Sequence, residues 1–278
     1  MERALQKIRK PAVSGQFYPD DPAVLKMQVS GFLAKAASQP DPNVRALIVP
    51  HAGYPYSGAV AAEAYKTLQG RHFDFVVIIA FLHRFFLQGV FVDDAHFYET
   101  PLGRVPVERL IVDRLRESNA YLDEEIKGSF AEHSLEVQLP FLQAVLPDLR
   151  IVPVYMGEQS LDNSEAIAAA LAIHLESRNA LVVASTDLSH FHPYAAAVER
   201  DKHTIRMIER GDVMKLGRAS QAGEVEACGL GTVIASLLLA EKKGWSKPEL
   251  IRYANSGDVT GDRSSVVGYA AMKFSEKA

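Results

Sequence analysis

The chain of 278 residues lacks several features that would assign it to a common class of protein. It has a single cysteine, Cys228, so no internal disulfide can form, which indicates a reducing compartment. Its apolar runs, such as residues 75–82, are far shorter than the roughly 20 residues that span a bilayer. The N-terminus also has no apolar region typical of a signal peptide. Together these absences predict a cytoplasmic protein that does not associate with membranes.

The charge pattern and the missing motifs disfavour further classes of function. The net charge is −4 and the basic residues form no stripe, so nothing indicates nucleic-acid binding. The chain has no G-x-S-x-G, no Walker A loop, no HExxH and no paired CxxC. The run GLGTVI lacks the third glycine of a dinucleotide-binding loop. Serine hydrolases, P-loop NTPases and Rossmann dehydrogenases are therefore disfavoured.

Short apolar runs alternate with helical stretches along the chain. The runs predict strands at residues 44–50, 75–81, 151–156 and 180–185, with two later strands near 250–253 and 265–274. Helices are predicted over 163–176 and from Ser57, the expected N-cap of the stretch SGAVAAEAYKTL. Strands that alternate with helices predict an α/β fold whose largely parallel sheet is covered on both faces.

Titratable side chains follow three of the predicted strands. His51 follows the first strand, His83 the second, and Asp187 with His190 the strand at 180–185. Ligands of parallel sheets bind outside the carboxyl ends of the strands, so we expect these residues to share a functional site. An aspartate beside an imidazole can fix its tautomer, tune its basicity or share a metal with it. The simpler alternatives, structural histidines and a turn-capping aspartate, remain open, and His192 is expected to point outward.

The run EHSLEVQLPF at residues 132–141 predicts a helix that Pro140 kinks. Glu132 and His133 lie at the start of this helix, where we expect them to support other site residues or to contact a substrate. Glu136 is equally compatible with a structural and a functional role, because carboxylates near a helix N-terminus often only interact with the helix dipole.

Cys228 directly precedes the apolar helix predicted from GLGTVIASLLLA. A helix N-terminus favours the thiolate form of cysteine. The neighbouring Gly229 and Gly231 indicate a close approach of the backbone to another group. A ligand role is therefore predicted for the thiol, with an inert buried cysteine as the alternative.

Several motifs in this order resemble the Memo family, whose bacterial and archaeal members are called AmmeMemoRadiSam system protein B. They are PAVSGQFYP, VPHAGYPYSG, EHSLEVQLPFL, STDLSHF, CGLGTV and YANSGDVTGDRSSVVGYAA. The resemblance extends over nearly the whole chain and implies a single Memo-like domain, residues 1–278. It also implies a three-layer α/β fold, LigB-like and related to class III extradiol dioxygenases, with a mixed, mostly parallel sheet and helices on both faces.

The resemblance implies a metal pocket at one edge of that sheet. Class III dioxygenases hold non-haem iron(II) with two histidines and a glutamate, whereas the matching Memo cluster is two histidines and a cysteine. In this chain the cluster falls on His51, His83 and Cys228, with Asp187 and His190 lining the same pocket. Two imidazoles and a thiolate favour copper(I), zinc or iron.

One stretch departs from the Memo pattern. Phe81 and Leu82 precede His83, where the family usually has Gly-Pro and a small polar residue. Because these side chains are bulky, we expect either a metal pocket narrower than is usual in the family or a His83 imidazole turned away from that pocket.

Three functions are compatible with these residues. The first is a metal-dependent, dioxygenase-like oxidoreductase in which His190 is the acid/base and Asp187 orients it. The second is a non-catalytic scaffold or binding protein. The resemblance implies phosphotyrosine peptides as ligands of eukaryotic members, and radical-SAM and AMMECR-like proteins as partners of microbial ones. The third is a zinc-dependent hydrolase that uses Asp187, His190 and Glu132.

Overall fold

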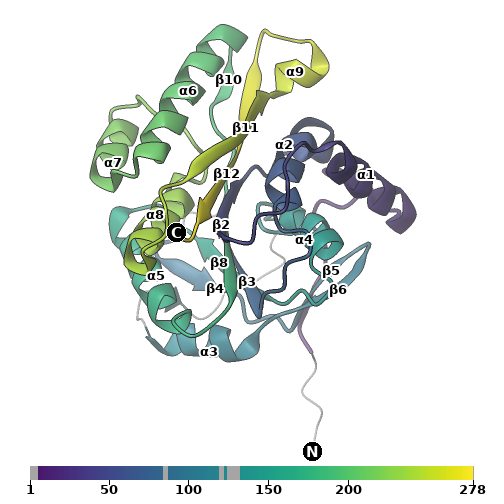
Figure 1. Cartoon of the computed structure of the whole chain (residues 1–278), viewed down its shortest axis with the longest axis vertical. Helices are drawn as coiled ribbons and strands as arrows, with labels where there is room; N and C mark the ends of the chain where they lie inside the picture. Colours follow the sequence, from purple (N-terminus) through teal and green to yellow (C-terminus); the bar gives the residue numbers. More distant parts are fainter. Residues whose placement is uncertain (1–5, 84–86, 119–121, 124–131, 278) are drawn as a thin grey trace, which may run out of the picture.

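A mixed, largely parallel β-sheet forms the centre of the molecule (Figure 1). This computed structural model describes residues 6–83, 87–118, 122–123 and 132–277. Within these ranges the sheet has nine strands, in the order β10-β12-β2-β9-β3-β8-β4-β7, with β11 paired to β12. The four central strands are parallel: β2 (Val44–Val49), β9 (Ala180–Ser185), β3 (Phe75–Phe81) and β8 (Ile151–Met156). The others are β10 (His190–His192), β12 (Val266–Ser275), β4 (Val90–Val92), β7 (Leu122–Asp123) and β11 (Glu249–Asn255).

The central strands lie where the apolar runs predict them, because each is buried on both faces. Every residue of β8 and β9 is buried, and β3 is buried up to its last residue. Runs without polar alternation are typical of parallel strands covered by helices on both sides. Strands β11 and β12 pair antiparallel at one side of the sheet, and β12 also pairs antiparallel with β2.

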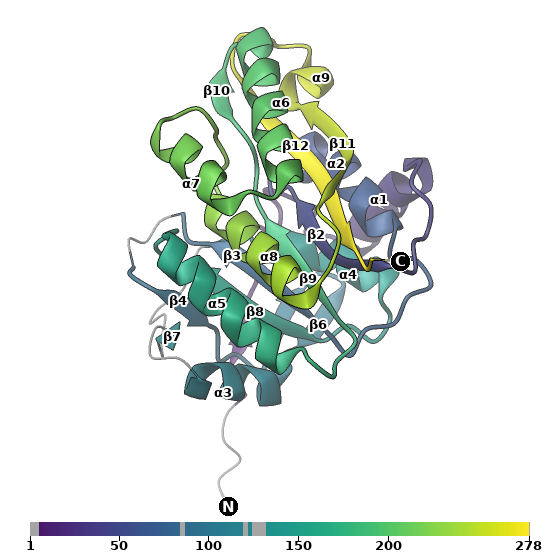
Figure 2. The same ribbon diagram turned by 60° about the vertical axis from the view of Figure 1, so that its left-hand side comes forward.

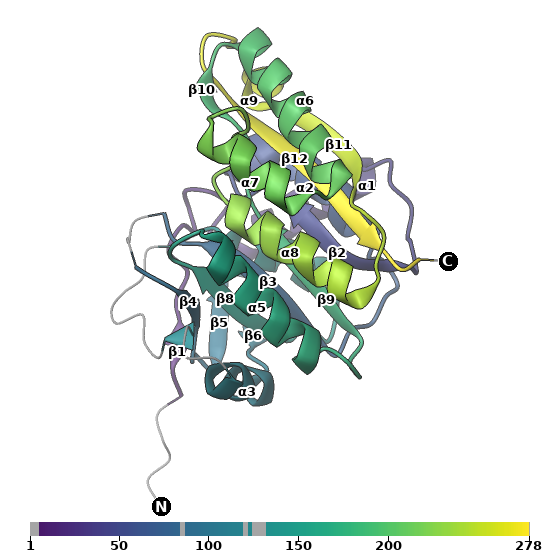
Figure 3. The same cartoon turned by 90° about the vertical axis from the view of Figure 1, so that its left-hand side faces the viewer.

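Two groups of helices pack against this sheet (Figures 1 to 3). Helix α2 (Tyr54–Lys66) contacts β2 and β12. It also packs against α1 (Pro22–Lys35), α4 (Leu139–Val145) and α9 (Ser256–Thr260). Helix α8 (Leu230–Lys243) contacts β9 and β3. It joins α5 (Leu161–His174), α3 (Arg109–Ser118), α7 (Val213–Gln221) and α6 (Tyr194–Arg210) on the other side. Among the helices of the described ranges, none has both the length and the hydrophobicity of a membrane-spanning segment.

Two helix starts differ from the sequence prediction, and proline explains both. Helix α2 begins at Tyr54, with Pro55 in its first turn, so Ser57 lies inside the helix and donates a hydrogen bond to the Ala52 carbonyl. Pro140 likewise lies in the first turn of α4, after the short 3₁₀-helix η1 (Glu136–Gln138), and so it does not kink a longer helix. Proline fits a first turn because the N–H that it lacks has no partner within the helix there.

A small second sheet and the N-terminal segment lie beside the main sheet. Strands β1 (Ile8–Arg9), β5 (Phe97–Thr100) and β6 (Gly103–Pro106) form the small sheet. The segment after β1 is held by Glu136, whose buried carboxylate accepts hydrogen bonds from the backbone N–H groups of Ala12 (2.6 Å) and Val13 (3.0 Å). The Tyr18 hydroxyl donates a third, at 2.6 Å. The structure therefore assigns Glu136 a structural role.

We predict that Glu136→Gln destabilises the protein by about 2–3 kcal/mol, because one carboxylate oxygen becomes an NH₂ group that faces a backbone N–H. Urea unfolding followed by circular dichroism would measure the change. The matched control is Glu165→Gln on the exposed side of α5, where we expect a change within about 0.5 kcal/mol. Equal effects of the two substitutions would contradict the role assigned to Glu136.

Candidate metal centre

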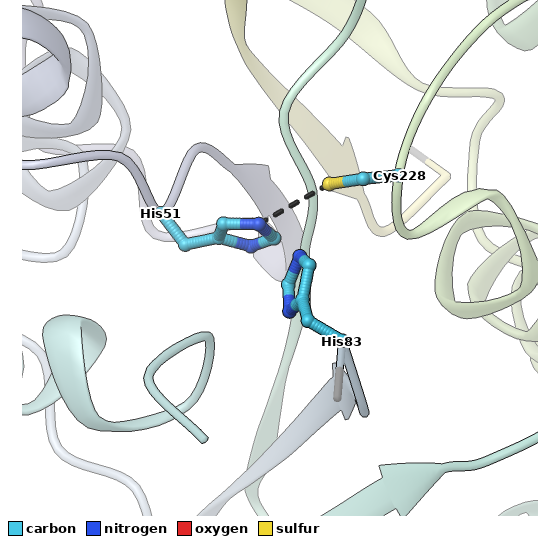
Figure 4. A group of neighbouring side chains, drawn as sticks. All are labelled: His51, His83 and Cys228. Atoms are coloured by element: carbon cyan, nitrogen blue, oxygen red, sulfur yellow. Dashed lines mark hydrogen bonds between the residues drawn. The ribbon is translucent and has the colours of Figure 1, made fainter. Parts of the chain in front are cut away.

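The titratable residues predicted to share a site lie just beyond the carboxyl ends of neighbouring parallel strands. His51 follows the end of β2 by two residues, His83 follows β3 by two, and Asp187 follows β9 by two. Cys228 approaches the same place from the segment before α8. One nitrogen from each of His51 and His83 and the Cys228 sulfur lie within 4.8 Å of one another, close enough to hold one metal ion. The predicted meeting of these three side chains is confirmed (Figure 4).

The hydrogen bonds of Ser185 determine which nitrogen of His51 faces the cluster. The Ser185 hydroxyl donates to the Ser134 carbonyl at 2.6 Å and accepts from the Gln138 amide at 2.9 Å. The same Ser185 oxygen lies 2.9 Å from His51 Nδ1. Because its only hydrogen is donated to Ser134, the hydroxyl can only accept here, so His51 Nδ1 must carry the proton. His51 Nε2 is then the unprotonated nitrogen, and it lies 3.2 Å from the Cys228 sulfur (Figure 4).

Glu132 orients His83 in the same way. Its Oε1 lies 3.0 Å from His83 Nδ1, and its Oε2 accepts the His83 backbone N–H at 2.7 Å. Burial alone would raise the pKa of Glu132, but the hydrogen bonds from His83 and from the Ser134 N–H outweigh it and hold this pKa well below its ordinary value. An ionised carboxylate only accepts hydrogen bonds, so His83 Nδ1 carries a proton and Nε2 is left as the metal-binding nitrogen.

His83, Glu132 and His133 form a second group whose donor atoms lie close enough for a metal. However, Glu132 Oε1 already accepts the backbone N–H groups of His133 and Ser134, both at 2.8 Å, in addition to His83 Nδ1. A carboxylate with its lone pairs occupied by N–H donors is suited to orienting a ligand rather than to binding the ion itself. The His133 ring stacks on His83, with centroids 4.7 Å apart.

Two hydrogen bonds join Asp187 and Cys228, one to the cysteine sulfur and one between backbone groups. The Asp187 N–H donates to the Cys228 sulfur at 3.2 Å, and the Cys228 N–H donates to the Asp187 carbonyl, also at 3.2 Å. Burial raises the pKa of the Cys228 thiol to about 12, and the Asp187 charge acts in the same direction. The predicted preference for the thiolate is therefore wrong for the metal-free protein, because burial outweighs the effect of the helix N-terminus. Burial also raises the pKa of Asp187 to about 6.

The glycines beside Cys228 allow the close approach that the sequence indicates. A Cβ atom on Gly229 would lie 2.4 Å from the Ser185 carbonyl oxygen, and one on Gly231 would lie 2.8 Å from the Gln159 side chain. Both contacts are shorter than real Cβ atoms show, so a larger residue at either position would force the backbone beside Cys228 or its neighbours to shift.

His190 is held in place by Glu226, a residue that the sequence prediction did not include. Glu226 Oε1 accepts the His190 backbone N–H at 2.8 Å, and Oε2 lies 2.7 Å from His192 Nε2. His192 thus pairs with Glu226 and takes no part in the His/Cys group. Within the described residues no hydrogen bond joins His190 to Asp187, whose carboxylate instead accepts the His51 N–H at 2.8 Å.

The bulky residues before His83 do not turn it out of the cluster. Leu82 is buried in the core, and the Phe81 ring packs edge-on against the His83 ring at 4.9 Å. Sequence reasoning missed Ser185, Gln138 and Glu226. The first two belong to the motifs STDLSHF and EHSLEVQLPFL, but nothing in their spacing indicates which histidine they support.

Comparison with known proteins settles the family. A profile described as Memo-like protein matches residues 9–273. The chain belongs to the Memo family. A MEMO1 family protein of Metallosphaera sedula is 36% identical, over 96% of this chain and 99% of that protein. The corresponding protein of Methanothermobacter thermautotrophicus is 38% identical, over 95% of this chain and 99% of its own length.

A solved structure shares the fold of this Memo-family chain. It is an uncharacterized protein from Escherichia coli K12, with a TM-score of 0.54 and 15% sequence identity, which covers 83% of this chain and 99% of its own. At this level of identity the match concerns the α/β architecture alone.

Phe191, between His190 and His192, has a strained backbone that should affect the stability of variants at this position. Its φ is 61°, the only positive φ of a non-glycine residue in the described ranges, and its side chain is 76% exposed. Left-handed backbone costs about 1 kcal/mol in any residue with a Cβ atom. We therefore expect Phe191→Gly to be more stable than Phe191→Ala by about 1 kcal/mol in urea unfolding. A Phe191→Ala variant that is the more stable of the two would show that the backbone here is not strained.

Proposed function

We propose that this Memo-family protein binds one transition-metal ion through His51, His83 and Cys228. The observation that carries the proposal is the convergence of three donor atoms. Two of them are on imidazoles whose other nitrogen is hydrogen-bonded to a buried side chain. A histidine oriented by a second group is typical of metal sites, because the hydrogen bond fixes the ring and directs its lone pair.

The electrostatics around the cluster support this proposal. Burial lowers the pKa of His51 well below its ordinary value, and the nearby His133 and His83 lower it further. His51 is therefore neutral at physiological pH, which is the form that binds metals. The Cys228 thiol accepts a hydrogen bond from the Asp187 N–H, which would also stabilise the thiolate that a metal requires.

The donor set favours copper(I), zinc or iron over hard cations such as magnesium and calcium, which prefer oxygen ligands. A bound iron or copper ion would supply redox chemistry, and the protein would supply the pocket and the proton transfers. The likeness to the LigB-like three-layer fold of class III extradiol dioxygenases, which the family resemblance implies, supports a dioxygen-dependent oxidoreductase as the activity.

In this activity we assign proton transfer to the His190 side chain. His190 is partly buried and follows Asp187 by three residues, and its charge lowers the pKa of both His51 and Asp187, which supports this assignment. Glu226 holds its backbone, which limits how far the imidazole can move. The buried Asp187 carboxylate positions the backbone of His51 through the 2.8 Å hydrogen bond.

The metal proposal predicts one metal ion per chain in protein purified without added metal and analysed by elemental mass spectrometry. We expect His83→Ala to lose stoichiometric metal, because one of three ligands is removed. Glu132→Gln should retain the ligands and bind the metal about 10–100-fold more weakly, because His83 is no longer oriented by a carboxylate.

The matched control is His203→Ala, which removes a partly buried histidine of α6 outside the site and should leave the metal content unchanged. Thermal unfolding of each variant would separate loss of metal from loss of fold. Full metal content in His83→Ala would overturn the proposed ligand set.

A separate experiment tests the activity: oxygen uptake by the iron-loaded protein is measured with each of a series of catechols as substrate. His190→Ala should keep its metal content and lose turnover by about 100-fold or more, because it lacks the proton-transferring imidazole. His192→Ala is the control, since His192 pairs with Glu226. If His190→Ala turns over substrate as fast as the parent protein, the proton-transfer role of His190 is excluded. If the parent protein holds stoichiometric metal but takes up no oxygen, the binding-protein alternative is favoured.

A further inference from the structure

A basic cavity lies at the edge of the sheet opposite the metal centre. It has a volume of about 590 Å³, and four cationic residues line it: Arg45, Arg71, Arg178 and Lys243. Arg45 lies near the start of β2 and Arg178 shortly before the start of β9, whereas the metal centre lies beyond the carboxyl ends of these strands. Strands of six residues place the two sites roughly 20 Å apart.

The cations of this cavity exceed its carboxylates, although the whole chain has a net charge of −4. Two carboxylates line it, Glu176 and Glu276, and Glu276 pairs with Arg45 at 2.7 Å. Arg71, Arg178 and Lys243 form no ion pair with a carboxylate anywhere in the described residues. The cavity therefore has positive charge that the protein itself does not neutralise.

The Arg71 guanidinium group is held by protein contacts, and the Arg45 guanidinium group has a buried nitrogen without a partner among the described residues. Arg71 donates to the Asp41 carbonyl at 2.9 Å and lies over the Phe73 ring, 4.8 Å from its centroid. Arg45 Nη1 is buried and has no hydrogen-bond partner among the described residues. Both residues line the same cavity, and Arg71 Nη1 also lies 3.5 Å from the carbonyl of Val44, the residue before Arg45. The like charge of Arg45 accordingly adds to burial in lowering the pKa of Arg71. Neighbouring guanidinium groups of this kind are suited to a ligand with several anionic oxygens.

We propose that this cavity binds a small molecule that carries a phosphate group. Arg71, Arg178 and Lys243 would contact the phosphate oxygens, because planar guanidinium groups match their geometry. The volume is typical of small-molecule sites and exceeds the needs of a phosphate alone, so an organic portion would pack against Leu175 and Trp245, which also line the cavity. This site is independent of the metal centre.

The cavity contains its own reporter, because Trp245 is the only tryptophan of the chain. Titration with inorganic pyrophosphate should change the tryptophan fluorescence saturably, with one site per chain by calorimetry. Arg178→Ala and Lys243→Ala should each weaken binding by about tenfold or more, since each removes a charge-assisted hydrogen bond. Lys202→Ala, an exposed lysine of α6, is the matched control and should bind as the parent protein does.

The same titration in His83→Ala distinguishes this site from the metal centre, where pyrophosphate could chelate an ion. We expect unchanged affinity in that variant, so a failed metal proposal would not affect the outcome. The inference is overturned if pyrophosphate leaves the Trp245 fluorescence unchanged. It is also overturned if Arg178→Ala, Lys243→Ala and Lys202→Ala all bind with the affinity of the parent protein, which would indicate diffuse attraction to the surface.

Discussion

The hydrogen bond between Ser185 and His51 is the interaction on which the candidate metal centre depends. It joins the last residue of β9 to the loop after β2, two strands that are already paired in the sheet. Because the serine hydroxyl donates to a carbonyl and accepts from Gln138, the imidazole has a single tautomer compatible with this network. The nitrogen that faces Cys228 is consequently available to a metal.

One short segment, residues 132–138, supports the site and the fold together. Its four buried polar side chains have separate partners. Glu132 orients His83, Ser134 donates to the Phe81 carbonyl, Glu136 holds the N-terminal segment, and Gln138 contacts Ser185 and the Pro50 carbonyl. Since the segment contacts the loops after both β2 and β3, a shift in it would move both histidines. This explains why a stretch that supplies none of the three proposed ligands carries so many buried polar residues.

The parallel arrangement of the central strands also separates two chemical environments. At the carboxyl ends, the buried His51 imidazole, the partly exposed His83 imidazole and the Cys228 thiol provide soft donor atoms. At the amino ends, arginine and lysine side chains surround a cavity with excess positive charge. The fully buried strands β8 and β9 lie between these two environments and keep them apart.

The sequence by itself determined the four central strands and the place of His51, His83 and Asp187, because continuous apolar runs end shortly before these residues. The short strands and the order of the strands in the sheet did not follow from it. Only the tertiary structure decided the role of Glu136, the tautomers of the two histidines and the raised pKa of Cys228. Each of these depends on atoms contributed by segments tens of residues away, such as Ala12 for Glu136 and Asp187 for Cys228. The local periodicity of a sequence indicates which side of a helix or strand is buried. The hydrogen-bond donors, hydrogen-bond acceptors and charges that surround a buried side chain depend on how distant segments pack.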